Sequence, residues 1–316
     1  MTHNSVSTQD ENGHWTHTLS QSWIGTFLTC PEKARRGATG EVGWVDSDSS
    51  VTGSAVHHVI QYVLEGIIQD QVTFDLGDAL SEFDDRFDRM LEQREVYVSG
   101  GENTWEDRDD ENQIVWIKRR KPQTARAFGR RAVHQWYTEV LPALSPWATE
   151  VSWGPLRLLH DDTRTVLVKG TVDYLDRHLG ACDWKTGSRP YEPWEKDRWN
   201  IQRTVYGWAL RHRGFTNVEA IDTYQGPLDQ FTFWVLGDFD KAPQPVPVTS
   251  SDEFDRWFKQ QVESMLPLME SGASVWPKND QHALCSPRWC EAFRTCKGLD
   301  IRTPKWAQAV DTAPWT

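Results

Sequence analysis

Apolar residues recur every three or four positions in several stretches of the sequence, and this spacing predicts helices with one buried face. The first such stretch follows Thr52, a plausible N-cap, and contains Val56, Val59, Ile60, Val63 and Leu64. It places His57 within the first two turns of a helix. The same spacing predicts further helices over about 79–94, through Phe128, Ala132 and Trp136, over 197–212 and over 254–269.

Residues 149–187 follow a different pattern, in which the segments read as strands. We predict strands over 150–153, 165–176 and 181–187, with a turn at 177–180, and a further strand over 231–236. The proline-rich segment 241–248 reads as a linker to the last helix. Strands among helices in this order predict an α/β fold, with a mixed central β-sheet flanked by helices.

The length of 316 residues fits one large domain. Residues 1–16 are polar and unpatterned, and residues 301–316 contain prolines without periodicity, so we expect both segments to be flexible tails. Between them we expect a single domain over 17–300. Within it, a helical insertion is expected at about 75–140 and a cysteine-containing segment at 280–298.

Composition narrows the class of protein. Hydrophobic residues make up 38% and charged residues 25% of the chain, and no apolar run approaches the roughly 18 residues of a membrane helix. The first residues lack the basic start and apolar core of a secretory signal. We therefore expect a cytoplasmic protein without a membrane partner, in a compartment that keeps thiols reduced. Most of the eighteen tryptophans are expected in the core, although some could stack on bases.

The formal net charge of −12 argues against a protein that coats nucleic acid non-specifically, but it leaves room for a local basic groove. An acidic stretch at 100–112 is followed by a run of basic residues: Lys118, Arg119, Arg120, Lys121, Arg126, Arg130 and Arg131. Such a run is either a solvated helix face or a surface that binds phosphates. Our candidates for DNA binding are Arg119, Arg120, Arg126 and Arg130.

The candidate chemistry begins with Asp183 and Lys185, which flank Trp184 at strand spacing and therefore share one face of a strand. Alone, such a triplet would be read as a surface ion pair. Asp173 lies ten residues earlier, on the strand that should pair antiparallel across the 177–180 turn, so a second carboxylate reaches the same end of the sheet. Converging carboxylates repel unless a proton or a cation bridges them, and hard oxygen ligands suit Mg²⁺ or Mn²⁺.

Three further residues can complete this site. His57 offers an imidazole as a third metal ligand, and the Lys185 ammonium can orient the attacking water and stabilise charge on a phosphate. Gln202 and Tyr206 lie four residues apart on one helix face. They could hold a phosphate or the metal-bound water, or they could form an ordinary polar stripe.

These residues carry a resemblance to a known family. The ordered set resembles the RecB-like PD-(D/E)XK nucleases, which include CRISPR-associated adaptation nucleases and many phage exonucleases: Gly53-x-x-x-His57, Gly170-x-x-Asp173, Asp183-Trp184-Lys185-Thr186-Gly187 and Gln202-x-x-x-Tyr206. The resemblance spans about Ser20 to Cys296. It implies a restriction-endonuclease-like core and a catalytic Lys185, with His57, Asp173, Asp183 and the Trp184 carbonyl as metal ligands. Many members have Glu where this chain has Asp183.

The cysteines suggest a second metal centre. Three of the five lie close together as Cys285-x4-Cys290-x5-Cys296, whereas Cys30 stands near the start of the chain. In a reducing compartment such a group indicates a metal before a disulfide, and the missing C-x-x-C pairs favour iron-sulfur over zinc. The resemblance implies that these four hold a 4Fe-4S cluster that joins the N- and C-terminal segments. Cys182 should instead point into the packed face opposite Asp183.

The function that we favour is a DNA exonuclease acting on single strands or free ends in recombination, repair or phage DNA processing. The sequence contains no G-x-x-x-x-G-K-[ST] motif, so any unwinding would need a helicase or recombinase partner. One alternative is an adaptation-type nuclease that trims DNA with an integrase partner. Another is a non-catalytic iron-sulfur DNA-binding module, which would predict a damaged site, whereas His57, Asp173, Asp183 and Lys185 are all present.

Overall fold

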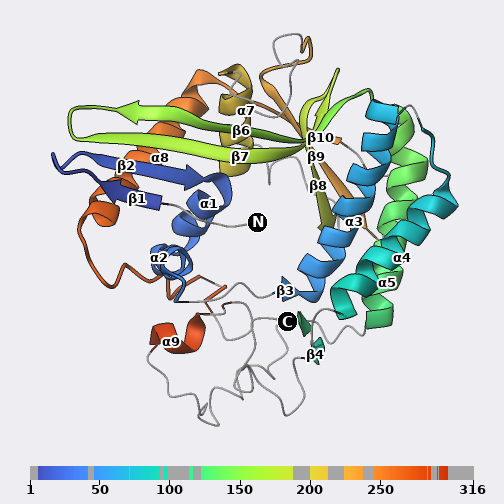
Figure 1. The fold of residues 1–316 in the computed structure, drawn as a ribbon, viewed down its shortest axis with the longest axis horizontal. Helices are drawn as coiled ribbons and strands as arrows, with labels where there is room; N and C mark the ends of the chain where they lie inside the picture. The colour runs from blue at the N-terminus through green and yellow to red at the C-terminus, as the bar shows by residue number, and fades with distance from the viewer. Residues whose placement is uncertain are drawn as a thin grey trace.

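A seven-stranded mixed β-sheet with helices on both sides dominates the computed structural model (Figure 1). The structure describes residues 6–41, 46–70, 72–92, 96–98, 114–116, 122–187, 200–212, 224–237, 243, 245–282, 284–285, 290 and 292–297. The large sheet contains β1 (Val6–Gln9), β2 (Trp15–Ser20), β6 (Pro146–His160), β7 (Arg164–Asp176), β8 (Gly180–Gly187), β9 (Gln230–Gly237) and β10 (Pro245–Thr249). The predicted α/β fold with a mixed central sheet is confirmed.

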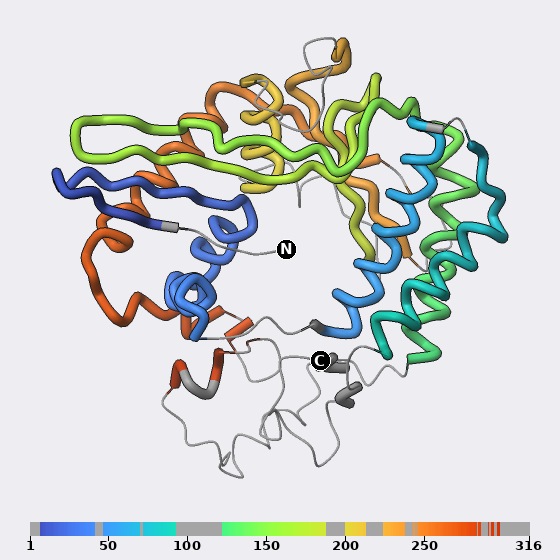
Figure 2. The backbone as a smooth tube through the Cα atoms, in the orientation of Figure 1, coloured from blue at the N-terminus to red at the C-terminus, as the bar shows by residue number. Residues whose placement is uncertain are grey.

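Helices cover the two faces of this sheet in two groups. The described helices are α1 (Gln21–Thr29), α2 (Pro31–Thr39), α3 (Asp48–Glu65), α4 (Leu76–Glu92), α5 (Pro122–Gln135), α7 (Ile201–Arg211), α8 (Asp252–Glu270) and α9 (Phe293–Lys297). Figure 2 shows α1 and α2 on one side of the molecule and α3, α4 and α5 on the other. A small second sheet joins β3 (Asp46–Ser47), β5 (Ile114–Trp116) and β4 (Val96–Val98). Among the described residues no helix is long and apolar enough to span a membrane.

The large sheet divides at β7. One edge of β7 pairs with β6, whereas the other edge pairs in parallel with β2 over residues 164–169 and antiparallel with β8 over residues 174–176. Within the described part of the chain, neither β2 nor β8 pairs with residues 170–173 between these two stretches. We call this short stretch of β7, which pairs with β6 along one edge only, the fork. It coincides with the motif that ends in Asp173.

Alternating side chains of the central strands enter two separate hydrophobic cores, as the period of two along a strand requires. Ala181 and Phe231 belong to the core that contains α1, α7 and α8. Cys182 and Trp184 belong to the core that contains α3, α4 and α5. Cys182 is fully buried, so its predicted place in the packed face opposite Asp183 is confirmed. Much of the tryptophan content is also packing, because these indoles are buried: Trp23, Trp136, Trp153, Trp184, Trp208 and Trp234.

The predicted helices are present with shifted ends. Helix α3 begins at Asp48, four residues before the predicted N-cap Thr52. Ser47 caps it instead, since its hydroxyl accepts from the Ser50 N–H while the Ser50 side chain accepts from the Ser47 N–H. The cap of α7 is Asn200, whose side chain accepts from the Arg203 N–H at 3.0 Å.

Two segments expected to lack regular structure contain strands. Residues 6–9, expected in the tail over 1–16, form β1 and pair with β2, which begins at the end of that tail; β2 in turn pairs with β7. The segment 241–248, expected to be a linker, contains most of β10, which pairs antiparallel with β9. Its two valines are buried while Pro245 and Pro247 are exposed, which an edge strand tolerates because it leaves one row of backbone donors unused. The expected tail at 301–316 lies outside the described residues.

Candidate active site

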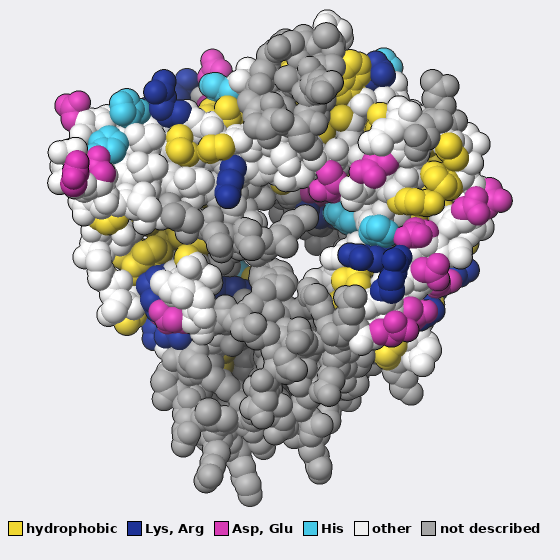
Figure 3. Space-filling model, in the orientation of Figure 1, with side chains coloured by type: hydrophobic (Ala, Val, Ile, Leu, Met, Phe, Trp, Pro, Cys, Tyr) yellow, Lys and Arg dark blue, Asp and Glu magenta, His cyan; other side chains and the backbone are white. Residues whose placement is uncertain are grey.

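Three carboxylates lie on neighbouring strands at the fork. Thr149 pairs with Tyr174 and Val151 pairs with Val172, so Glu150 of β6 lies beside Asp173 of β7. On the other side, the pairing of Tyr174 with Cys182 brings Asp183 of β8 next to Asp173. We call Glu150, Asp173 and Asp183 the carboxylate row. On the face seen in Figure 3, acidic and histidine side chains gather beside a central hollow.

Helix α3 supplies the histidine. A Cβ atom at Gly53 would lie 3.2 Å from the Thr186 hydroxyl oxygen, so this glycine lets α3 pack closely against β8. The close approach brings His57 Nδ1 to 3.4 Å from Asp173 Oδ2. Gly170 also makes room, since a Cβ atom there would lie 2.6 Å from the Trp153 indole. The structure therefore assigns a packing role to both glycines of the sequence motifs.

The Asp183 carboxylate is almost completely buried and faces several partners. The Gln202 side chain donates to Oδ1 at 2.5 Å, and the Tyr206 hydroxyl hydrogen-bonds with Gln202. The Lys185 ammonium lies 2.6 Å from Oδ2. Oδ2 nevertheless accepts no well-aligned hydrogen bond from any described residue. The structure thus brings four of the predicted site residues together and leaves one buried carboxylate oxygen able to accept a further partner.

The electrostatic environment favours protonation of two members of the carboxylate row, Asp173 and Glu150. Burial raises the pKa of Asp173 to about 6, with repulsion from Asp183 adding to the effect and His57 and Lys185 opposing it. Burial, followed by repulsion from Asp173, raises the pKa of Glu150 to about 7. Burial and the neighbouring carboxylates also raise the pKa of the Tyr206 hydroxyl well above its usual value. A site that holds protons near neutral pH in this way is suited to exchange them for a divalent cation.

Glu150 was missed in the sequence, although the strand that contains it was predicted. Its backbone has a φ of +45°, which among the described residues is unique for a non-glycine residue. Holding such a conformation costs on the order of 1 kcal/mol, and it persists only where the surrounding structure enforces it. The one available signal was an acidic residue at the start of the predicted strand 150–153. Its approach to Asp173 depends on the register in which β6 pairs with β7, which no local pattern reveals.

The ligand set predicted for Mg²⁺ or Mn²⁺ is close together but not arranged for coordination. No group of three His, Cys, Asp or Glu side chains in the described part of the chain is placed to hold a metal ion. His57 contacts Asp173, whereas Asp183 is engaged by Gln202 and Lys185. Trp184 donates its backbone N–H to Asp173 Oδ2 at 3.2 Å, and its buried indole stacks on Tyr174. The ligand role of its carbonyl stays a prediction.

The four cysteines predicted to bind a cluster line a single pocket. Cys30, at the junction of α1 and α2, shares it with Cys285, Cys290 and Cys296. None of the five cysteines, all of which the structure describes, forms a disulfide, and Cys182 is buried elsewhere in the fold. The pocket is also lined by three lysines: Lys33, Lys278 and Lys297. Burial raises the pKa of the Cys285 thiol despite the nearby Lys297.

The basic residues predicted to bind DNA are only partly described. Arg119 and Arg120 lie outside the described residues. Arg126 and Arg130 project from α5 toward α4, where both form ion pairs with Asp84 and Arg126 also pairs with Asp88. These two arginines therefore connect helices, and their part in binding DNA stays a prediction.

Paired acidic residues, a lysine and a histidine thus lie together where the mixed sheet divides at β7. The sequence model of the PD-(D/E)XK nuclease superfamily matches residues 18–297, a span that contains the carboxylate row and all four pocket cysteines. A search of curated proteins finds no match. The chain belongs to the PD-(D/E)XK nuclease superfamily, whose members are nucleases, and its mixed sheet is consistent with a restriction-endonuclease-like fold.

Proposed function

We propose that this protein is a Mg²⁺- or Mn²⁺-dependent DNA exonuclease of the RecB-like branch of its superfamily. The observation that carries the proposal is the buried Asp183 carboxylate, which faces Asp173 across the fork and is engaged by Gln202 and Lys185. A surface ion pair would need neither the burial nor the second carboxylate. The order of the sequence motifs supports the RecB-like assignment.

The donor atoms at the fork suit a divalent cation, although the side chains are not arranged to coordinate one. The Lys185 ammonium is the described partner of the buried Asp183 Oδ2, and Asp173 has a raised pKa, so a cation would add a second partner to the first and displace a proton from the second. His57, Asp173, Asp183 and the Trp184 carbonyl would hold it. When bound, a divalent cation stabilises charge on the phosphate and lowers the pKa of an attacking water.

The remaining side chains act around that position. The Lys185 ammonium orients a water and offsets negative charge on the phosphate. Gln202 fixes the orientation of the Asp183 carboxylate by donating to Oδ1, and the Tyr206 hydroxyl hydrogen-bonds with Gln202. The burial of Tyr206 keeps its hydroxyl protonated, so it acts as a hydrogen-bonding group and not as a base.

The pocket of four cysteines supports a 4Fe-4S cluster as a second cofactor. Four thiolates are the usual ligand set for such a cluster, and the three lysines that line the pocket can offset its negative charge. Held by Cys30, Cys285, Cys290 and Cys296, the cluster would join the α1–α2 junction to the segment that contains α9. Its role would be structural.

The biological setting that we propose is DNA recombination, repair or phage DNA processing in the cytoplasm. The substrate would be single strands or free DNA ends. Because the sequence lacks a phosphate-binding loop for nucleotide hydrolysis, a helicase, recombinase or integrase would supply the ends.

The test is a comparison of substrates that differ only in their ends. Purified protein is incubated with Mg²⁺ or Mn²⁺ and with linear or covalently closed circular DNA, each in single- and double-stranded form. We expect release of nucleotides from linear DNA and no cleavage of circles. Cleavage of circles would show an endonuclease, and no cleavage of any substrate would contradict the proposal. Lys259→Ala, which changes an exposed lysine on α8, should retain full activity.

A further inference from the structure

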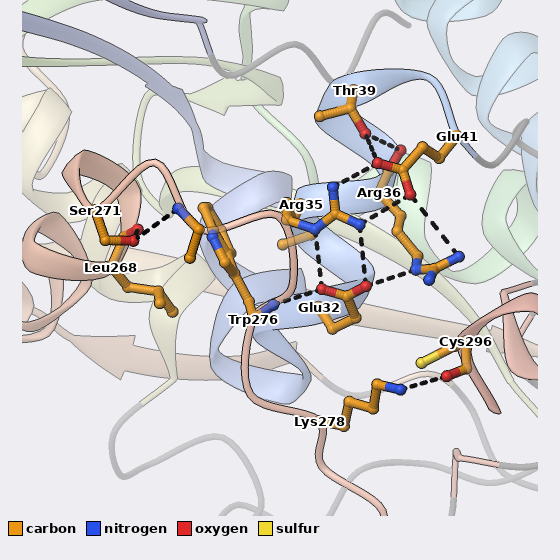
Figure 4. A network of polar contacts seen from close by, with 12 residues as sticks. Glu32, Arg35, Arg36, Thr39, Glu41, Leu268, Ser271, Trp276, Lys278 and Cys296 are labelled. Atoms are coloured by element: carbon orange, nitrogen blue, oxygen red, sulfur yellow. Dashed lines mark hydrogen bonds and ion pairs between the residues drawn. The ribbon is translucent and has the colours of Figure 1, made fainter. Parts of the chain in front are cut away.

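Glu32 is a fully buried carboxylate that connects two distant parts of the chain. Its two oxygens accept four hydrogen bonds (Figure 4): two from Arg35 at 2.9 and 3.0 Å, one from Arg36 Nε at 2.7 Å and one from the Trp276 N–H at 2.8 Å. The backbone N–H of Glu32 also donates to the Pro277 carbonyl at 3.2 Å. Helix α2 is thus bound to residues 276–277 by both the side chain and the main chain of one residue.

These contacts surround the cysteine pocket. Glu32 follows Cys30 by two positions, and Asn279 donates its side-chain N–H to the Thr29 carbonyl at 2.8 Å. Lys278, which precedes Asn279, donates an ammonium hydrogen to the Cys296 carbonyl (Figure 4). The segment 276–279 is therefore fixed against the α1–α2 junction on one side and contacts the helix of Cys296 on the other. None of these contacts involves a thiol.

The carboxylate is charged throughout the physiological pH range. Burial alone would raise the pKa of Glu32, but hydrogen bonds from Arg35, Trp276 and Arg36 outweigh burial and lower the pKa to about 2. Arg35 also bonds with Glu41, so the two arginines and two glutamates form one network. Loss of the Glu32 charge would leave the largely buried Arg35 with one carboxylate partner in place of two.

We propose that Glu32 is a positioning residue that gathers the four cysteines into one pocket before any metal binds. The ligands of this site come from residue 30 and residues 285–296. Its apparent metal affinity is proportional to the fraction of metal-free molecules in which those ligands already lie together. The hydrogen bonds of Glu32 raise that fraction without a metal. The identity of the native metal rests on the proposed function, whereas the gathering of the thiols does not.

Cobalt(II) is a suitable probe, since its thiolate complexes absorb strongly and a tetrahedral four-thiolate site has a recognisable visible spectrum. Metal-free, reduced protein is titrated anaerobically with Co²⁺. We expect the thiolate absorption of wild type to reach its maximum at one thiolate-bound Co²⁺ per chain, with a four-thiolate spectrum. Glu32→Gln keeps the size of the side chain and removes its charge. It should weaken Co²⁺ binding by about tenfold or more, because the fraction of molecules with the four thiols together should fall by about tenfold.

The matched control is Glu270→Gln. Glu270 is partly buried and, like Glu32, connects distant segments, since it pairs with His17 of β2 and Arg164 of β7, but neither partner lies beside the cysteine pocket. This variant should lower the melting temperature and leave Co²⁺ affinity unchanged. If Glu32→Gln does not fold, Asn279→Ala replaces it, because that change removes only the bond to the Thr29 carbonyl.

The outcomes separate this proposal from the proposed function. Three results would each overturn the role of Glu32. They are a wild-type Co²⁺ affinity in Glu32→Gln, an equal loss of Co²⁺ affinity in Glu270→Gln, and a wild-type spectrum that lacks the four-thiolate signature. The protein could be isolated with zinc in place of iron and sulfide and still form a normal four-thiolate Co²⁺ site. That result would refute the iron-sulfur cluster and support the pre-formed pocket.

Discussion

Replacing Glu150 with glutamine should stabilise the metal-free protein at high pH. The wild-type carboxylate lies beside Asp173 in a partly buried position, where burial and repulsion disfavour its charged form. Glutamine has nearly the same shape and no charge. It also leaves the positive φ of residue 150 unchanged, so the backbone strain is common to both proteins and cancels in the comparison.

The magnitude follows from the pKa shift and its sign. The pKa of Glu150 rises from 4.5 to about 7 on folding, so between these values the folded state holds a proton that the unfolded state has lost. Stability therefore falls as pH rises through this window, and the full cost is present above about pH 7. At about 1.4 kcal/mol per pKa unit the upper limit is about 3.5 kcal/mol, which solvent screening of a partly exposed carboxylate reduces to about 1–3 kcal/mol.

The assay is urea denaturation of both proteins in EDTA at about pH 8.5 and about pH 5, with stability extrapolated to zero denaturant. Glu150→Gln should be more stable by about 1–3 kcal/mol at the higher pH and nearly equal to wild type at the lower one. Mn²⁺ should narrow the difference at pH 8.5, because the cation stabilises the charged row. Glu263→Gln, an exposed change on α8, supplies the baseline. Equal stability at both pH values, or a less stable variant at pH 8.5, would refute the reasoning.

Three further changes test the packing, the cluster and the site. Gly170→Ala forces a Cβ atom against the buried Trp153 indole and should cost about 1–3 kcal/mol, measured as a fall in melting temperature, whereas Gly37→Ala meets no atom within 4 Å and should be neutral or slightly stabilising. Cys30→Ala should abolish bound iron and sulfide in protein purified without air, while Cys182→Ala keeps both; the reverse pattern would refute the ligand set. Asp183→Asn should bind Mn²⁺ at least tenfold more weakly by calorimetry without unfolding, and unchanged affinity would exclude Asp183 as a ligand.

The parts of the site that were predictable depend on short-range geometry. Asp183 and Lys185 share a strand face because side chains alternate, and Asp173 reaches them because a tight turn joins β7 to β8. Gln202 and Tyr206 are four residues apart on α7, so a helix places them together wherever it packs. The position of His57 does not follow from local spacing, since only the approach of α3 to β8 at Gly53 brings it to Asp173.

The parts that were missed depend on pairing between distant segments. The β1–β2 hairpin is polar and reads as a tail, yet it is ordered by parallel pairing of β2 with a strand about 150 residues later. Strand β10 was read as a linker because it contains two prolines. Glu150 lies beside Asp173 because of the register in which β6 pairs with β7, and Glu32 is buried by a segment more than 200 residues away. A local sequence pattern contains no information on these contacts.

The most direct test of the central claim is the release of acid-soluble nucleotides from linear DNA by wild type and Lys185→Ala, purified identically and assayed with Mn²⁺ and with EDTA. Lys185 contacts Asp183 at the fork, and its loss should leave the fold and both proposed metal sites in place. We predict release by wild type that depends on Mn²⁺ and is lost by at least two orders of magnitude in the variant, the range typical of a catalytic group. Equal release by the two proteins, or release that persists in EDTA, would contradict the assignment of the active site to the fork.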